Sequence, residues 1–289
     1  MRIGLQLRPW LVEGSSLDEA CDQAVEAGFA AVELGYQFAK PMGAGAVAKV
    51  LASRGLSLAA LHIGLDWADA PDEEVRELAE GAALMAAASG SSYVLASTQP
   101  RGLDGEDALV LATNANRSLR RASFLAQEHG VTLCLHNHAW EFMREGVFEA
   151  LSAGLLLAVD VAHLWRAGED VEARLLGWGQ QVRYLHLRDA ADGTWVPVLG
   201  QGQLPLARWV KACAPTVDWG IVELEPDPLH LQESSAWPGT WTERAAKSMG
   251  FLVQSGLVSD STEHQDVCLG PITRESKQHK QFQQSKGRT

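Results

Sequence analysis

Short apolar runs alternate eight times with longer segments of helical spacing, from residue 3 to about Gly256 of this chain. The segments between the runs carry apolar residues at intervals of three and four, as in Leu17–Ala27, Asp72–Ala88 and Asp107–Glu128. Strands and helices that alternate in this way predict a parallel sheet covered by helices. The runs that we predict as strands are Ile3–Leu7, Ala30–Leu34, Ser57–Ile63, Ser92–Ser97, Val131–His136, Leu155–Asp160, Val182–Leu187 and Gly220–Glu225.

Two architectures accommodate eight such units with short connections: a closed barrel and an open, doubly wound sheet. An open dinucleotide-binding sheet is expected to carry a GxGxxG turn after its first strand, and the segment from Arg8 to Gly14 has none. A lone (β/α)8 barrel needs about 250 residues. We therefore predict an α/β protein with a single (β/α)8 TIM barrel over residues 1–257. Glycines just before five of the strands suit helix C-termini: Gly28, Gly55, Gly90, Gly130 and Gly154.

The alternating pattern stops after Gly256. Residues 258–289 are rich in Gln, Ser, Lys and Thr, have few large apolar side chains and show no sustained period. Such a composition buries too little apolar surface to order itself, so we predict a disordered polar tail.

Charge and cysteine usage narrow the classes of partner. The formal net charge is −12, and because the last 32 residues carry +1, the barrel region carries −13. An acidic body repels phosphate backbones, which argues against nucleic acid. No apolar run approaches the ~20 residues of a membrane span, and the first residues lack a signal-peptide layout. The four cysteines are scattered without a CxxC pair, which favours reduced thiols in the cytoplasm. A homo-oligomer is compatible with the sequence.

Polar side chains follow four successive predicted strands. In a parallel barrel all the C-terminal strand ends meet at one mouth, where such enzymes keep their active sites. Each residue alone has an ordinary explanation, as a half-buried histidine or a helix-capping carboxylate, but four coincidences at the same end favour a metal site. One Asp, one His and two Glu there would suit Mn²⁺, Mg²⁺, Co²⁺ or Zn²⁺. The residues are His136, Asn137, His138 and Glu141; Asp160 and His163; His186, Arg188 and Asp189; Glu223 and Glu225.

The same motifs, in this order, resemble the sugar phosphate isomerase/epimerase branch of the xylose-isomerase-like TIM barrel superfamily. The segment from His136 to Phe142 looks like its HNHxxEF motif, and Asp160–His163 looks like its DxxH motif. His186–Asp189 is similar to HLKD, with Arg188 in place of Lys, and Leu199–Gly202 is similar to LGEG. Gly220 with Glu225 and Asp227 matches the final G…VEQD strand. The resemblance covers roughly residues 1–256.

The resemblance implies roles for individual residues. It implies metal ligation by Glu141, Asp160, His186 and Glu225, with Glu141 and Glu225 also moving the proton. His136 is the alternative to Glu141 as a ligand. Glu223, which shares a strand face with Glu225 by the two-residue alternation, is the alternative to Glu225. Substrate contacts are expected from His136, His138, His163, Arg188 and His62. His62 and Glu33 have helix capping or core hydrogen bonding as alternative explanations.

The implied activity is that of a divalent-metal-dependent isomerase or epimerase acting on a small keto-sugar or sugar-like molecule through an enediolate. The runner-up is a metal-dependent lyase or dehydratase on a keto-inositol or a 3-keto-glycoside, because both reactions share the first proton abstraction. An apurinic-site endonuclease from the same superfamily needs a basic DNA-binding face, which a net charge of −13 for residues 1–257 disfavours. A non-catalytic barrel that serves as a binding protein is the alternative from a different class.

Overall fold

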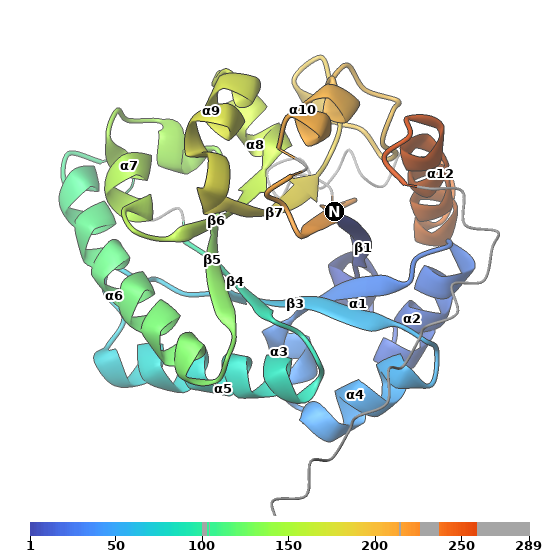
Figure 1. The fold of residues 1–289 in the computed structure, drawn as a ribbon, viewed down its shortest axis with the longest axis horizontal. Helices are drawn as coiled ribbons and strands as arrows, with labels where there is room; N and C mark the ends of the chain where they lie inside the picture. The colour runs from blue at the N-terminus through green and yellow to red at the C-terminus, as the bar shows by residue number, and fades with distance from the viewer. Residues whose placement is uncertain (100–102, 104, 214, 226–236, 259–289) are drawn as a thin grey trace, which may run out of the picture. The chain divides into compact units, whose positions relative to one another are not determined.

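The computed structural model describes residues 1–99, 103, 105–213, 215–225 and 237–258. Apart from Val258, the predicted tail lies outside these residues, as does Asp227. Within them, eight parallel strands close into a barrel in the order β1-β10-β7-β6-β5-β4-β3-β2, and the helices surround it (Figure 1). The predicted (β/α)8 barrel is thereby confirmed. The barrel strands are β1 (Arg2–Gln6), β2 (Ala31–Gly35), β3 (Ser57–Gly64), β4 (Tyr93–Ser97), β5 (Thr132–His136), β6 (Leu156–Asp160), β7 (Val182–Leu187) and β10 (Trp219–Val222).

Helices cover the outside of this barrel, and their ends follow from local sequence. At α2 and α12, Ser16 and Thr240 accept the backbone N–H of a glutamate three residues on, whose carboxylate caps them in return. The α-helices are α1 (Arg8–Val12), α2 (Leu17–Glu26), α3 (Tyr36–Ala39), α4 (Ala44–Ala52), α5 (Asp72–Ala88), α6 (Ala108–Glu128), α7 (Val147–Ser152), α8 (Val161–Arg166), α9 (Val171–Trp178), α10 (Leu206–Cys213) and α12 (Trp241–Gln254). Two 3₁₀ turns are η1 (Trp140–Phe142) and η2 (Gly179–Gln181).

All five glycines that we placed at helix C-termini have positive φ, between 66° and 88°.

The strand ends differ from the prediction mainly at the last strand. The final strand was predicted to reach Glu225 but ends at Val222. Its neighbour β7 ends at Leu187, which pairs with Val222, and the Glu223 N–H still donates to the Leu187 carbonyl at 3.1 Å, as the last bond between the two. The shorter strand places Glu223 directly at the mouth.

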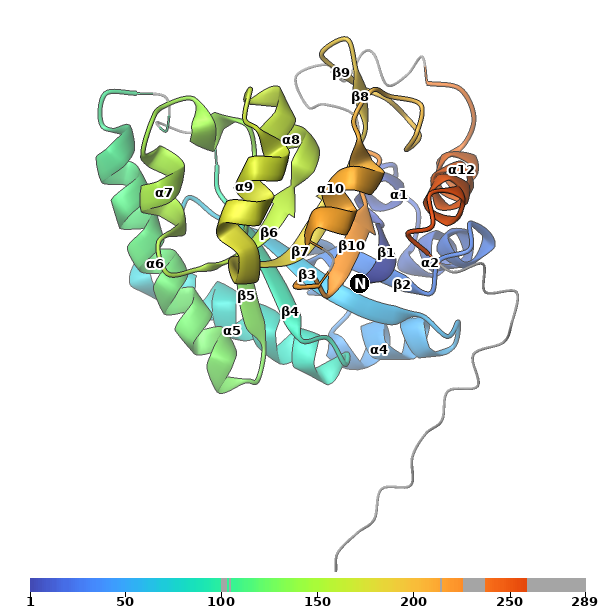
Figure 2. The same ribbon diagram turned by 45° about the horizontal axis from the view of Figure 1, so that its top comes forward.

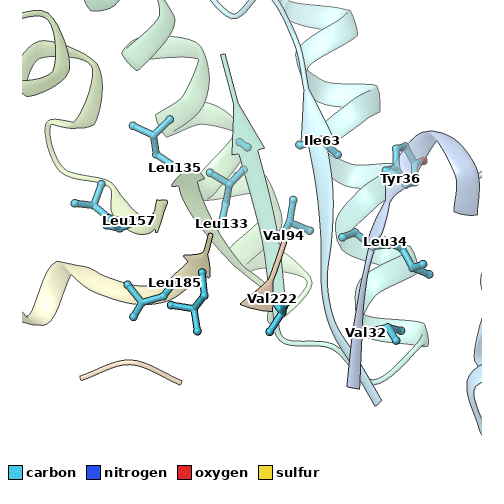
Figure 3. Packing of buried hydrophobic residues seen from close by; sticks show 14 of the residues in the cluster. Val32, Leu34, Tyr36, Ile63, Val94, Leu133, Leu135, Leu157, Leu185 and Val222 are labelled. Carbon is cyan, nitrogen blue, oxygen red and sulfur yellow. The ribbon is translucent and has the colours of Figure 1, made fainter. Parts of the chain in front are cut away.

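Buried apolar side chains form two layers. The larger cluster packs the outward faces of the strands against the helices and includes Val32, Leu133 and Leu185 (Figure 3). A smaller cluster fills the inside of the barrel, with Leu95 and Tyr184 among its members. The inward positions nearer the C-terminal ends are polar instead, which marks that end as the site.

A short antiparallel hairpin, β8 (Ala190–Ala191) and β9 (Thr194–Trp195), follows β7 and lies at one end of the barrel (Figure 2). No helix among the described residues is long and apolar enough to cross a membrane.

Candidate metal centre and active site

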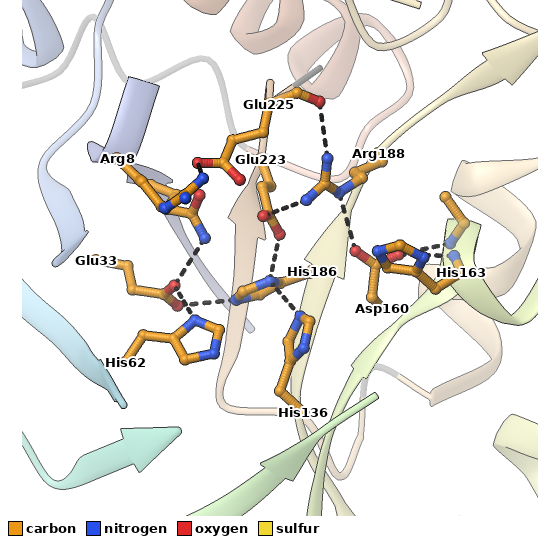
Figure 4. Close-up of polar contacts among 12 residues, drawn as sticks. Arg8, Glu33, His62, His136, Asp160, His163, His186, Arg188, Glu223 and Glu225 are labelled. Carbon is orange, nitrogen blue, oxygen red and sulfur yellow. Dashed lines mark hydrogen bonds and ion pairs between the residues drawn. The ribbon is translucent and has the colours of Figure 1, made fainter. Parts of the chain in front are cut away.

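Strand alternation brings a ring of polar side chains together inside the barrel. Cys134, Ala158 and Tyr184 belong to the inner apolar cluster. The residues two positions further along the same strands are His136, Asp160 and His186, which therefore point the same way, nearer the mouth. All three are at most 1% exposed. Glu33 on β2, His62 on β3 and Glu223 just after β10 complete the ring (Figure 4). Gln6 joins it from β1 through a hydrogen bond to Glu33.

Four of these residues offer ligand atoms that all lie within 4.8 Å of one another: His136, Asp160, His186 and Glu223. His136 Nε2 is 2.9 Å from His186 Nδ1, which is itself 2.5 Å from Glu223 Oε2. Ligands at about 2.0–2.2 Å from a metal give donor–donor spacings of this order or slightly more. The predicted ligands Asp160 and His186 are thus brought together, and their companions are the two alternatives, His136 and Glu223.

His186 is oriented from behind by Glu33. Its Nε2 lies 2.9 Å from Glu33 Oε2, which also accepts the hydroxyl of Tyr184 at 2.8 Å. Gln6 donates to the other oxygen of Glu33 at 3.1 Å, and His62 Nδ1 lies 3.5 Å from that oxygen. With Nε2 turned to a carboxylate, Nδ1 faces the cluster, as in the carboxylate–histidine pairs that support metal ligands.

The charges around His186 shift its pKa and that of Glu33. Burial alone would lower the pKa of His186, but Glu33 and Glu223 on either side raise it well above its usual range. Burial alone would raise the pKa of Glu33, and His186 with His62 instead brings it down to about 2. Without a metal, a proton on His186 Nδ1 satisfies this arrangement, and a cation would take the same place.

Arg188 joins the two carboxylates of the cluster. Its Nε donates to Asp160 Oδ2 at 3.0 Å, and one of its terminal nitrogens donates to Glu223 Oε1. Its other terminal nitrogen donates to the backbone oxygen of Glu225 at 2.8 Å. Asp160 Oδ1 accepts the backbone N–H groups of Ala162 and His163, both at 2.9 Å, and so caps α8. Arg188, predicted to contact substrate, thus neutralises and orients the carboxylates.

The donor atoms fit a divalent cation. Glu223 Oε2 is buried and faces His186 Nδ1 at 2.5 Å, so it has a hydrogen-bond donor there only when that nitrogen is protonated. A buried carboxylate oxygen without a hydrogen-bond donor is costly unless a cation compensates it. His136 adds a neutral imidazole, because burial and then the neighbouring His186 lower its pKa well below the usual range. Two nitrogens and two carboxylates form a chemically reasonable metal set.

Glu141 and Glu225, the other two predicted ligands, are not among these four residues. Glu141 lies in η1 and is fully buried, and its carboxylate accepts the Thr98 hydroxyl at 2.5 Å and the His138 N–H at 2.6 Å. Glu225 lies two residues beyond Glu223, and its carboxylate pairs with Arg8 (Figure 4). Burial and Glu223 raise the pKa of Glu225, against the lowering effect of Arg8.

A row of rings continues from the cluster through the loops after β5, β6 and β7. His138 stacks on Trp140 with centroids 3.9 Å apart and meets the edge of His163 at 5.0 Å. His163 packs edge-on against Trp195 at 5.3 Å. The Nδ1 atoms of both histidines and Nε1 of Trp195 are buried and make no hydrogen bond. Burial and then His138 keep the pKa of His163 well below its usual range, so His163 offers this wall an uncharged imidazole.

Two motif residues support the site without belonging to the cluster. Asn137 exchanges hydrogen bonds with the backbone of Asp160, at 3.0 and 3.3 Å, which joins the ends of β5 and β6. Asp189 accepts four backbone N–H groups, two of them from Gly200 and Gly202, and so secures the segment that resembles the LGEG loop. A Cβ on Gly202 would meet the carboxylate of Asp189 at 2.2 Å, which explains the glycine.

Sequence reasoning did not single out Trp195, Gln6 or Tyr184. Gln6 and Tyr184 occupy inward positions of β1 and β7, so strand alternation alone could have identified them. Trp195 belongs to a two-residue strand in a hairpin, and no periodic signal marks so short an element.

Comparison with known proteins agrees with this geometry. The family model of the xylose isomerase-like TIM barrel matches residues 21–252. None of the curated proteins matches the chain. Solved structures that share the fold include the following three. A sugar phosphate isomerase/epimerase from Parabacteroides distasonis has TM-score 0.69 and 18% identity, covering 87% of this chain and 93% of that one. D-Allulose 3-epimerase from Methylomonas sp., in complex with D-allulose, has TM-score 0.68 and 17% identity, covering 88% and 97%.

The third, a probable 3-DHS dehydratase from Bacillus anthracis, has TM-score 0.68 and 14% identity, covering 88% of this chain and 99% of that one. At such identities the structures show a shared fold, whereas the family model spans most of the barrel in sequence. The chain belongs to the xylose isomerase-like TIM barrel family.

Proposed function

We propose that this protein is a divalent-metal-dependent isomerase or epimerase that acts on a small keto-sugar or sugar-like substrate through an enediolate. The observation that carries the proposal is the buried cluster of His136, Asp160, His186 and Glu223 at the mouth of the barrel. Beside it lies the row of rings formed by His138, His163 and two tryptophans.

Each group of residues has a distinct task in this scheme. The four clustered residues would hold the ion, which supplies Lewis-acid polarisation of a substrate carbonyl when bound. His138 and His163 would hold substrate hydroxyls through their unpartnered nitrogens. Glu225 and Glu141 would remove and return the proton, as the resemblance implies. Return to the opposite face of the same carbon gives an epimer, and delivery to the neighbouring carbon gives an isomer.

Arg188 and Arg8 serve the carboxylates in this scheme. Arg188 joins Asp160 and Glu223, which keeps the two negative charges close together without a metal. Arg8 pairs with Glu225 and is half exposed, so that it can turn aside at little cost when Glu225 approaches a substrate carbon.

A lyase or dehydratase on a keto-inositol or 3-keto-glycoside is the second candidate. It shares the proton abstraction and then expels a β-leaving group. The observation in its favour is the pair His138 and His163, whose buried Nδ1 atoms make no hydrogen bond in the structure and could donate one to a departing oxygen. A fold shared with a probable dehydratase is consistent with it.

Metal analysis followed by isotope exchange tests the proposal. The protein is purified without chelator, and bound metal is measured by elemental mass spectrometry beside an Asp160→Ala/Glu223→Ala double variant. We expect about one ion per chain, absent from the variant. Ketoses, D-allulose among them, and keto-glycosides are then incubated with the loaded enzyme in deuterated water.

Deuterium in a recovered ketose or its epimer supports the isomerase, and a released leaving group supports the lyase. A wild-type protein that takes up no metal after rechallenge with Mn²⁺, Co²⁺ or Zn²⁺ contradicts both and favours a binding protein.

A further inference from the structure

We propose that this centre selects Zn²⁺, Fe²⁺ or Co²⁺ over Mn²⁺ and excludes Mg²⁺, and that His136 is the residue that sets this preference. The inference rests on the metal-binding part of the proposed function and names the class of ion. It follows from three features of the cluster: its nitrogen donors, its burial and the prior commitments of its oxygens.

The two imidazole nitrogens of the cluster favour Zn²⁺, Fe²⁺ or Co²⁺ over Mg²⁺. His136 Nε2 and His186 Nδ1 face each other at 2.9 Å, so one ion can contact both imidazoles. Imidazole suits zinc, iron, copper and nickel, whereas magnesium is held by carboxylates, carbonyls and water. For divalent ions at a mixed nitrogen and oxygen site, affinity rises from Mn²⁺ through Fe²⁺ and Co²⁺. His136 is one of only two nitrogen ligands in the described cluster, so its identity decides half of the nitrogen contribution.

The burial of the four ligand side chains also disfavours Mg²⁺. His136 is 1% exposed, Asp160 and His186 are 0% exposed and Glu223 is 5% exposed. Magnesium gives up its hydration water reluctantly and usually keeps several waters in protein sites. The four ligand side chains are at most 5% exposed, so a cation among them would exchange several of its waters for protein ligands. Zinc and cobalt, by contrast, are readily held by three or four protein ligands.

Three of the four carboxylate oxygens of Asp160 and Glu223 already accept hydrogen bonds. Asp160 Oδ1 accepts two backbone N–H groups, and its Oδ2 accepts Arg188. Glu223 Oε1 also accepts Arg188, which leaves Glu223 Oε2 as the carboxylate oxygen of the pair that faces the histidine nitrogens, 2.5 Å from His186 Nδ1. The guanidinium reduces the negative charge that would attract a hard ion. The least committed donors are therefore two nitrogens and one oxygen, the composition of His₂Glu catalytic zinc sites.

Competition titrations on the whole protein test this preference directly. Metal is removed by dialysis against a chelator, and Zn²⁺, Co²⁺, Mn²⁺ and Mg²⁺ are titrated against a fluorescent chelator of known affinity. We expect Zn²⁺ to bind at least about a thousandfold more tightly than Mg²⁺. His136→Glu, which keeps a ligand but replaces nitrogen by oxygen, should narrow that ratio by at least about tenfold. The visible absorption of bound Co²⁺ should also shift with the loss of one nitrogen ligand.

Two further variants make the result interpretable. His129→Glu places the same substitution at a histidine beyond the end of α6, and should leave the ratio and the Co²⁺ spectrum unchanged. His136→Gln is used if His136→Glu proves unfolded by circular dichroism, since it removes the ring nitrogen without adding a charge.

Equal affinity for Mg²⁺ and Zn²⁺ in the wild type, or an unchanged ratio in the folded His136 variants, would overturn the inference and leave the proposed function standing. Selective metal binding without isotope exchange into any ketose would support the inference while the isomerase proposal failed. Absence of binding by all four ions overturns both.

Discussion

Two carboxylates flank the imidazole of His186, Glu33 at Nε2 and Glu223 at Nδ1. The sequence placed Asp160 and His186 near the ends of two clear apolar strands, and the resemblance implied that both are ligands. For the other two ligands the resemblance implied Glu141 and Glu225, with His136 and Glu223 as alternatives. The structure gathers His136 and Glu223 with Asp160 and His186. Strand alternation cannot separate Glu223 from Glu225, because both lie on one face.

Glu223 and Glu225 can be distinguished by separating metal binding from turnover. Glu223→Gln should lower metal affinity at least about 100-fold, because it removes the charge next to His186 and Arg188. Glu225→Gln should leave metal affinity within about twofold and reduce turnover by about 10²–10⁴-fold, as expected for loss of a general base. Isothermal titration and deuterium exchange measure the two effects. Equal loss of metal in both variants would place Glu225 among the ligands.

Glu33 is expected to act through His186 rather than on the substrate. Glu33→Gln keeps an acceptor for Tyr184 but weakens the charged partner of His186 Nε2. Metal affinity should fall about 10–100-fold, the usual effect of removing such an outer partner. The measurement is a chelator competition, with Glu26→Gln on the exposed end of α2 as the matched control. If affinity is unchanged, Glu33 is not a positioning residue for this centre.

At the scale of elements, apolar periodicity predicted the barrel strands to within a few residues because each run is long enough to show its alternation. The connections were less accessible. The β8–β9 hairpin has two-residue strands and depends on long-range hydrogen bonds, chiefly those of Asp189 to the segment from Gly200 to Leu204. Local sequence does not encode such a closure except as a short motif, and the resemblance to HLKD and LGEG loops was the available signal.

The loop held by Asp189 provides the prediction at this scale. Each Asp189 oxygen accepts two backbone N–H groups, so in Asp189→Asn the amide NH₂ would face two donors and two of the four bonds would be lost at a buried site. Hydrogen bonds to charged groups contribute about 1.5–3 kcal/mol each. We therefore expect the free energy of unfolding, measured in urea titrations, to fall by at least about 3 kcal/mol. Asp192→Asn, an exposed change in the same hairpin, should be nearly neutral, and an equal loss there would contradict the argument.

For the whole molecule, the regular alternation in sequence and the packing in space agree. The core consists of apolar side chains between the barrel and its helices and of those inside the barrel. The polar residues of the cluster lie nearer the C-terminal ends of the strands. The stability of the fold therefore depends mainly on the apolar side chains buried on both sides of the strands. We expect the barrel to remain folded without a bound metal ion. What sequence could not supply is the partner of each polar group, because those partners come from strands far apart in the chain.

The buried thiols report on this packing as a whole. Cys21, Cys134 and Cys213 are free and buried. Burial raises the pKa of Cys21 to about 12 and that of Cys213 to about 11, and it raises the pKa of Cys134 further. Because the thiolate is the reactive form, none of the three should react with iodoacetamide in the native protein at pH 8, and all should react in guanidinium.

The raised pKa values of these thiols also predict that the folded state loses stability at alkaline pH. A folded-state pKa above the unfolded value of about 8.5 means that the unfolded chain loses its thiol protons first. The contribution to stability is complete below that pH and is lost progressively as the pH rises toward about 11–12, the values for Cys213 and Cys21. Urea midpoints measured from pH 8 to 11 should therefore fall, and less so in a Cys21→Ala/Cys213→Ala variant. Cys134 lies on β5, between β4 and β6 in the sheet. If iodoacetamide labels Cys134 in the native protein faster than the protein unfolds globally, the barrel must open locally at this strand.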